Sequence, residues 1–116
     1  MKNNAILDKS KIFAVRIIKL YQFLSSEKKE FVLSKQLLKS GTSIGANVRE
    51  ANSSMSKAEF RAKMNIALKE ASESEYWLEL MQATDYLSKE QFESIYKDCN
   101  ELNKLLISII KKLNEE

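Results

Sequence analysis

The chain has 116 residues, of which 44% are hydrophobic and 30% are charged, which is typical of one globular domain spanning residues 1–116. It contains no proline, no histidine, two glycines and one cysteine, which argues against loop-rich and all-β folds, most metal centres and an internal disulfide. The net charge of +3 is too small by itself to indicate a nucleic-acid-binding protein.

The sequence also indicates the cellular compartment of the protein. No apolar segment approaches the roughly 20 residues that a membrane-spanning helix needs. The N-terminal sequence lacks the long apolar segment and cleavage site of a signal peptide, and a single cysteine gives no reason to expect an oxidising compartment. We therefore expect a cytoplasmic protein without membrane contact.

The first predicted helix runs from about Asp8 to Leu24, with Asp8 and Ser10 as candidate N-caps. Apolar residues at helical spacing define its inward face, namely Ile6, Phe13, Ile17, Leu20, Tyr21 and Leu24. Further apolar residues point in other directions, which predicts either a central position in a bundle or a contact between subunits. These residues are Ile12, Val15, Ile18 and Phe23.

The second predicted helix begins at about Glu27 or Glu30 and ends at Asn52. The polar connection before it is short enough to require an antiparallel neighbour. Gly41 and Gly45 both lie on the apolar face of this helix, where each costs up to about 1 kcal/mol relative to alanine. We infer that another helix backbone comes very close at these two positions.

Two further stripes run along the second helix. One is basic and carries Lys35, Lys39 and Arg49, and we expect Arg61 and Lys63 on the next helix to extend the same side. The other is polar and predicts a buried hydrogen-bond network, because an unsatisfied buried polar group costs about 1–3 kcal/mol. A ligand or partner site is the alternative for this stripe. The predicted network consists of Gln36, Ser43, Asn47, Glu50 and Glu75.

Two capping boxes mark the starts of the third and fourth helices. Ser56–Glu59 begins a helix that continues to about Thr84, and Ser88–Gln91 begins one that continues to about Leu113. Both helices carry an apolar stripe at helical spacing. Four helices with short connections predict an all-α fold, an antiparallel up-down-up-down four-helix bundle.

Few residues in the chain could support catalysis. Cys99 lies on the inward face of the fourth helix without a histidine to act as its base, so we expect it to be a packing residue. The two glycines lie inside a helix rather than in a phosphate-binding loop, and a di-iron site would require Glu-x-x-His pairs. We therefore predict a protein that is not an enzyme, with no metal, cofactor or small-molecule substrate.

The third helix carries a candidate subunit interface. Trp77 falls about 110° from the centre of the inward stripe, and Ile66 and Leu80 lie near it. A tryptophan with two aliphatic neighbours on a charged helix face is typical of an interface anchor. Together with the additional apolar residues of the first helix, this pattern predicts a homo-oligomer rather than a monomer.

Charge is distributed unevenly along the chain. Residues 1–63 hold 13 Lys and Arg against 5 Asp and Glu, a balance of +8, whereas residues 64–116 hold 6 against 11, a balance of −5. One interpretation is a basic surface for a polyanion. The other is that a basic hairpin packs beside an acidic hairpin, so that the charges serve only solubility and internal pairing.

Two motifs resemble those of a known family. The segments Ser43–Ala51 (SIGANVREA) and Glu70–Leu78 (EASESEYWL) are similar to those of four-helix-bundle proteins encoded within intervening sequences of bacterial 23S ribosomal RNA genes. The resemblance covers nearly the whole chain in length and in the order of elements. Many members have proline at the position of Gly45 and glycine at that of Ala51, so the helix kink of those members is not expected here.

The resemblance implies a bundle that assembles into a pentameric ring and has a mostly unassigned cellular role. A related group serves as accessory protein to the reverse transcriptase of diversity-generating retroelements and uses a basic ring surface to bind the enzyme and nucleic acid. By analogy, we expect the basic stripe to contact RNA, DNA or a nucleic-acid enzyme. The alternative is a purely structural or protein–protein adaptor without nucleic-acid contact.

Overall fold

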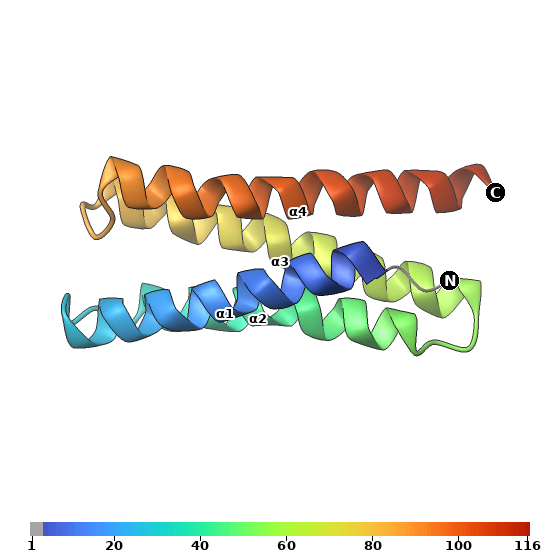
Figure 1. Ribbon diagram of the computed structural model, residues 1–116, viewed down its shortest axis with the longest axis horizontal. Helices are drawn as coiled ribbons and strands as arrows, with labels where there is room; N and C mark the ends of the chain where they lie inside the picture. The colour runs from blue at the N-terminus through green and yellow to red at the C-terminus, as the bar shows by residue number, and fades with distance from the viewer. Residues whose placement is uncertain (1–3) are drawn as a thin grey trace.

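The computed structural model describes residues 4–116, which form four helices lying side by side along one long axis (Figure 1). Helix α1 spans Asn4–Ser26, α2 spans Leu33–Asn52, α3 spans Lys57–Ala83 and α4 spans Lys89–Glu115. The molecule extends over 46 × 20 × 19 Å. The predicted all-α, up-down-up-down four-helix bundle is therefore confirmed.

The helices follow one another around the bundle in chain order. The start of α1 and the end of α4 lie at one end with the α2–α3 connection, and the other two connections lie at the opposite end (Figure 1). Each helix packs most extensively against its neighbours in the chain. The seam between α1 and α4, which closes the bundle, is the least extensive of the four.

One continuous apolar core fills the space between the helices, because each helix turns an apolar stripe inward. Within residues 4–116, no helix is long and apolar enough to cross a membrane. The large, fully buried side chains include Phe13, Ile17, Leu37, Ile44, Met64, Leu78, Met81, Leu102 and Leu106.

Helix α1 is longer than predicted, because its first turns are buried. It spans Asn4–Ser26, so the predicted N-caps Asp8 and Ser10 lie inside the helix and do not cap it. Ile6 and Ser10 are fully buried, which holds these turns against the bundle. The Ser10 hydroxyl donates to the carbonyl of Leu7 at 3.1 Å and is satisfied within the helix.

Helix α2 begins at Leu33, so the predicted start at or before Glu30 is wrong. Lys29 adopts a positive φ of 53°, which interrupts the helical path of the chain before Glu30. The Glu30 carboxylate then accepts hydrogen bonds from the N–H groups of Val32, Leu33 and Ser34, at 3.1, 3.0 and 2.7 Å.

Glu30 thus satisfies the first N–H groups of α2 from a position outside the helix. Burial raises the pKa of its carboxyl, but the backbone hydrogen bonds from Leu33, Ser34 and Val32 outweigh burial and hold the pKa below its ordinary value. This arrangement could not be predicted from the sequence, because Ser, Thr, Asp and Asn are the usual capping residues.

The capping box predicted at the start of α4 is confirmed, and the one predicted at α3 is only half formed. Ser88 Oγ accepts from the N–H of Gln91 at 3.1 Å, and Gln91 Oε1 accepts from the N–H of Ser88 at 2.9 Å. At α3, Ser56 Oγ accepts from the N–H of Glu59 at 3.1 Å. However, Glu59 Oε2 pairs with the N–H of Met55, the residue before the cap, also at 3.1 Å.

The two glycines of α2 differ in their surroundings. A Cβ placed on Gly41 would lie 2.8 Å from Cγ1 and 2.9 Å from Cγ2 of Ile17, so α1 leaves no room for a side chain there. A Cβ placed on Gly45 would lie 3.4 Å from the carbonyl oxygen of Ser10, which is an ordinary contact. At Gly41 the close neighbour is therefore the Ile17 side chain and not the predicted helix backbone. The backbone of Ser10 does approach Gly45, but it leaves room there for a methyl group.

Candidate nucleic-acid interface

The outer side of α2 carries three exposed cations that the sequence predicts as candidates. Lys35, Lys39 and Arg49 all point away from the core, and none of them forms an ion pair with another of residues 4–116. On an α-helix, Lys35 and Arg49 lie about 20 Å apart along the axis. We call these three residues the basic ridge.

The hairpin of α1 and α2 carries an excess of positive charge at its surface. Residues 4–52 include nine Lys and Arg against four Asp and Glu. Glu30 is buried and bonded to backbone, and Glu50 forms an ion pair with Lys63 on α3. The other two acids, Asp8 and Glu27, are exposed but too few to neutralise the hairpin.

Arg61 does not extend the basic ridge, whereas Lys63 lies beside α2 and is paired there, because α3 directs the two side chains to different neighbours. Residues two positions apart on a helix point about 200° apart. The Arg61 guanidinium faces α4, where Nη2 donates to the carbonyl of Leu113 at 3.4 Å. Lys63 faces α2, where Nζ lies 3.5 Å from Oε1 of Glu50.

A hollow of about 590 Å³ lies in the groove between α1 and α2, at the Arg49 end of the basic ridge. Small side chains on both helices leave this space open. We call it the α1–α2 hollow, and it is lined by Leu7, Asp8, Lys11, Ala14, Thr42, Gly45, Ala46 and Arg49.

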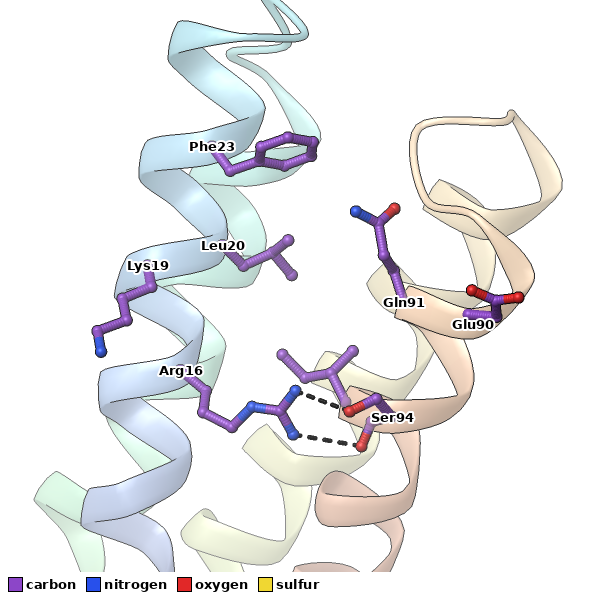
Figure 2. Close-up of a pocket in the computed structure, with 8 residues that line it drawn as sticks. Arg16, Lys19, Leu20, Phe23, Glu90, Gln91 and Ser94 are labelled. Atoms are coloured by element: carbon purple, nitrogen blue, oxygen red, sulfur yellow. Dashed lines mark hydrogen bonds between the residues drawn. The ribbon is translucent and has the colours of Figure 1, made fainter.

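A second cleft of about 510 Å³ opens between α1 and α4 near the α3–α4 connection (Figure 2). Apolar side chains such as Phe23 line it, and Arg16 closes one end. The Arg16 guanidinium donates to the carbonyl and hydroxyl oxygens of Ser94 at 3.3 and 3.0 Å and to Oδ2 of Asp98 at 2.6 Å. Because both terminal nitrogens of its guanidinium are engaged by α4, Arg16 connects the two helices.

The structure does not bring the five residues of the predicted polar network together. Gln36 and Glu50 are exposed. Ser43 Oγ donates to the carbonyl of Lys39 at 2.6 Å, and Asn47 Nδ2 donates to the carbonyl of Ser43 at 2.8 Å, both within α2. The α2 backbone itself therefore satisfies Ser43 and Asn47.

Glu75, the fifth predicted member, belongs to a different cluster. It faces α4, where its carboxylate accepts hydrogen bonds from the side-chain amides of Asn100 and Asn103. The buried polar contact between α2 and α3 is instead made by Ser40 and Ser74, whose hydroxyl oxygens lie 2.8 Å apart. Helical periodicity could not identify this pair, because the two serines meet only when α2 and α3 pack together.

The predicted interface residues lie along one edge of α3 and are only partly covered. Trp77 packs against the core but remains half-buried, and its Nε1 donates to Glu73 Oε1 at 3.2 Å. Ile66 is 42% exposed, and Leu80 is half-buried on the same side. The three apolar residues thus form a stripe that a partner surface could cover.

Other apolar side chains are also exposed. Of the α1 residues outside its inward face, Phe23 packs against the core. Sequence reasoning missed the exposed pair in the α1–α2 connection, because it placed that segment inside a helix. The exposed apolar residues of these two segments are Ile12, Val15 and Ile18 on α1, and Phe31 and Val32 in the connection.

Cys99 is a buried packing residue, as expected. It is fully buried, and its Sγ donates to the carbonyl of Ala71 at 3.4 Å. Burial, and to a smaller extent the nearby Glu75 and Asp98, raise the pKa of the thiol far above its ordinary value, which suppresses the nucleophilic thiolate. Within the part of the chain that the structure describes, no cluster of three or more acidic or cysteine side chains could hold a metal ion.

Comparisons with known proteins relate the chain to one family. Residues 2–108 match the family described as 23S rRNA-intervening sequence protein. The chain is also similar to a protein of unknown function from the S23 ribosomal protein family of Bacteroides thetaiotaomicron VPI-5482, known from a crystal structure at 1.70 Å resolution. The two are 64% identical with a TM-score of 0.93, over 96% of this chain and 99% of that chain. No curated protein matches the chain.

Proposed function

The chain belongs to the 23S rRNA-intervening sequence protein family, whose function is unknown, and we propose that it is a non-enzymatic homo-oligomer that binds RNA or DNA. The basic ridge is the observation that supports this proposal. Its three cations are exposed and form no ion pair with residues 4–116. The hairpin that carries them also has few acidic residues to neutralise their charge.

The basic ridge suits the phosphate backbone of a nucleic acid. Lysine and arginine bind phosphates largely through the release of counterions, which makes the affinity strongly dependent on salt. Contacts to phosphates position a protein on nucleic acid but do not read base sequence. Three cations in one subunit bind weakly, but a closed oligomer repeats the ridge in every subunit and gains affinity through multivalency.

Reversing the charge of the basic ridge should abolish nucleic-acid binding. The wild-type protein should retard RNA and DNA in an electrophoretic mobility assay at about 50 mM salt and lose this binding toward about 200 mM. The triple variant Lys35→Glu, Lys39→Glu, Arg49→Glu should retard neither, while circular dichroism shows an intact bundle, because exposed charges contribute only about 0–1 kcal/mol to stability.

A matched control changes the net charge equally at a different surface. Lys97, Lys104 and Lys111 are exposed on α4, and the triple variant Lys97→Glu, Lys104→Glu, Lys111→Glu should keep most of the binding. Equal loss in both triple variants would mean that overall charge, and not the ridge, governs binding. A wild-type protein that retards neither RNA nor DNA at low salt would favour the adaptor function in its place.

We further propose that the subunits assemble through the stripe of Trp77, Ile66 and Leu80 into the five-membered rings that the family resemblance implies. Trp77→Ala should weaken self-association strongly, while its cost to the fold stays near about 1–2 kcal/mol, because the ring is only half-buried in the subunit. Sedimentation at micromolar concentration measures the first effect, and chemical denaturation measures the second.

An exposed apolar residue on another helix provides the control for this variant. Ile107 on α4 is 52% exposed, and Ile107→Ala removes an apolar side chain that is not part of the proposed stripe. Its sedimentation should match that of the wild-type protein. A wild-type protein that sediments as a monomer at micromolar concentration would rule out the proposed interface.

A further inference from the structure

The α1–α2 hollow owes its shape to small residues on two helices. Ala14 on α1 and Gly45 and Ala46 on α2 leave a space of about 590 Å³ above the contact between the two helices. Leu7 adds an apolar side chain to its lining. The hollow therefore offers a small, largely apolar floor that opens to the outside of the hairpin.

Positively charged side chains line both sides of the α1–α2 hollow. Lys11 on α1 and Arg49 on α2 line it, both are exposed, and neither forms an ion pair with any of residues 4–116. The exposed carboxylate of Asp8 also lines the hollow and can accept a hydrogen bond. Together these groups provide two donors for phosphates and one acceptor for an N–H group.

Arg49 belongs both to the basic ridge and to the α1–α2 hollow. A nucleic-acid strand that follows the ridge from Lys35 past Lys39 therefore reaches the hollow at its Arg49 end. The bases of a single strand can turn out of their stack and pack against a protein surface, and arginine guanidinium planes also stack on bases. A duplex keeps its bases paired inside and offers the protein mainly its phosphates.

We propose that the α1–α2 hollow accepts an unpaired base of a single-stranded nucleic acid, with the flanking phosphates on Lys11 and Arg49. This inference rests on the proposed function, since it assumes that the basic ridge binds a nucleic acid. It adds a substrate class, because a base in the hollow makes the protein prefer single strands to duplexes of the same length.

Filling the hollow tests this proposal. Ala46 is exposed, and leucine has a helix propensity close to that of alanine, so Ala46→Leu should occupy the hollow without disturbing the bundle. The wild-type protein should bind an unstructured strand about tenfold more tightly than the matching duplex. Ala46→Leu should lose about this factor for the strand and keep its affinity for the duplex.

Ala62→Leu is the matched control, because Ala62 is an exposed alanine on α3, away from the hollow. It should retain the preference for the single strand. Equal losses for RNA and DNA strands in Ala46→Leu support recognition of the base. A loss confined to RNA would assign the hollow to the ribose hydroxyl and overturn the proposal.

Two further outcomes separate this inference from the proposed function. If Ala46→Leu retains the wild-type preference for single strands, or if the wild-type protein binds strand and duplex equally, the hollow takes no base, although the basic ridge still binds phosphates. If the wild-type protein binds no nucleic acid at about 50 mM salt, the proposed function fails and this inference fails with it.

Discussion

Replacing Gly41 with leucine should lower the free energy of unfolding by at least about 1–3 kcal/mol, although leucine has the better helix propensity. The added Cβ would lie 2.8 and 2.9 Å from the two branches of the Ile17 side chain. Ile17 is fully buried and β-branched, so it has few alternative rotamers, and α1 would have to move away from α2. Chemical denaturation followed by circular dichroism measures the loss.

Two companion variants test the cause of this loss. Gly45→Ala should be neutral or stabilise the protein by up to about 1 kcal/mol, because its Cβ would make only ordinary contacts with Ser10. Gly41→Leu combined with Ile17→Ala should be less destabilised than the sum of the single changes, since the two side chains compete for one space. An unchanged melting temperature for Gly41→Leu alone would contradict the close contact of α1 and α2.

Replacing Glu30 with alanine should destabilise the bundle by about 2 kcal/mol or more, because the N–H groups of Val32, Leu33 and Ser34 lose their acceptor. Glu30→Gln retains one acceptor oxygen and should cost less. Chemical denaturation of the two variants beside the wild-type protein measures both losses. A cost below about 0.5 kcal/mol for Glu30→Ala would show that water replaces the carboxylate at no penalty.

The contribution of Glu30 should also depend on pH. Its pKa in the folded protein lies below the ordinary value of 4.5, so the carboxylate stabilises the fold above the pKa of the unfolded chain. This stability is lost as the pH falls through the lower, folded-state pKa. The stability difference between the wild-type protein and Glu30→Gln should therefore be constant near neutral pH and shrink below pH 4.5. A difference that does not change with pH would exclude a charged cap.

The four helices could be predicted from the sequence because their signals are local. Apolar spacing identifies the inward face of each helix, and the capping box of α4 requires only Ser88 and Gln91, three positions apart. The start of α2 could not be predicted in this way. It depends on the positive φ of Lys29 and on a buried glutamate side chain that reaches back to the helix, and neither leaves a periodic pattern.

The sequence could predict those features of the candidate site that depend only on a residue's position around its own helix. The exposure of the basic ridge follows from its angle on α2. Pairing between helices depends instead on which residues meet in three dimensions, so the sequence could not place Lys63 beside Glu50 or Arg61 beside the end of α4. For the same reason it grouped Glu75 with α2, although Glu75 faces α4.

The four helix–helix seams of the bundle differ in extent, and this difference predicts the order in which they form during folding. Three seams join helices that follow one another in the chain, so little loop-closure entropy opposes their formation. The α1–α4 seam is the least extensive, and its Arg16–Asp98 ion pair joins residues 82 positions apart. Such a large sequence separation gives this contact a high cost of loop closure. We therefore expect the α1–α4 seam to be the last to close and the first to open, beginning at the cleft beside Arg16.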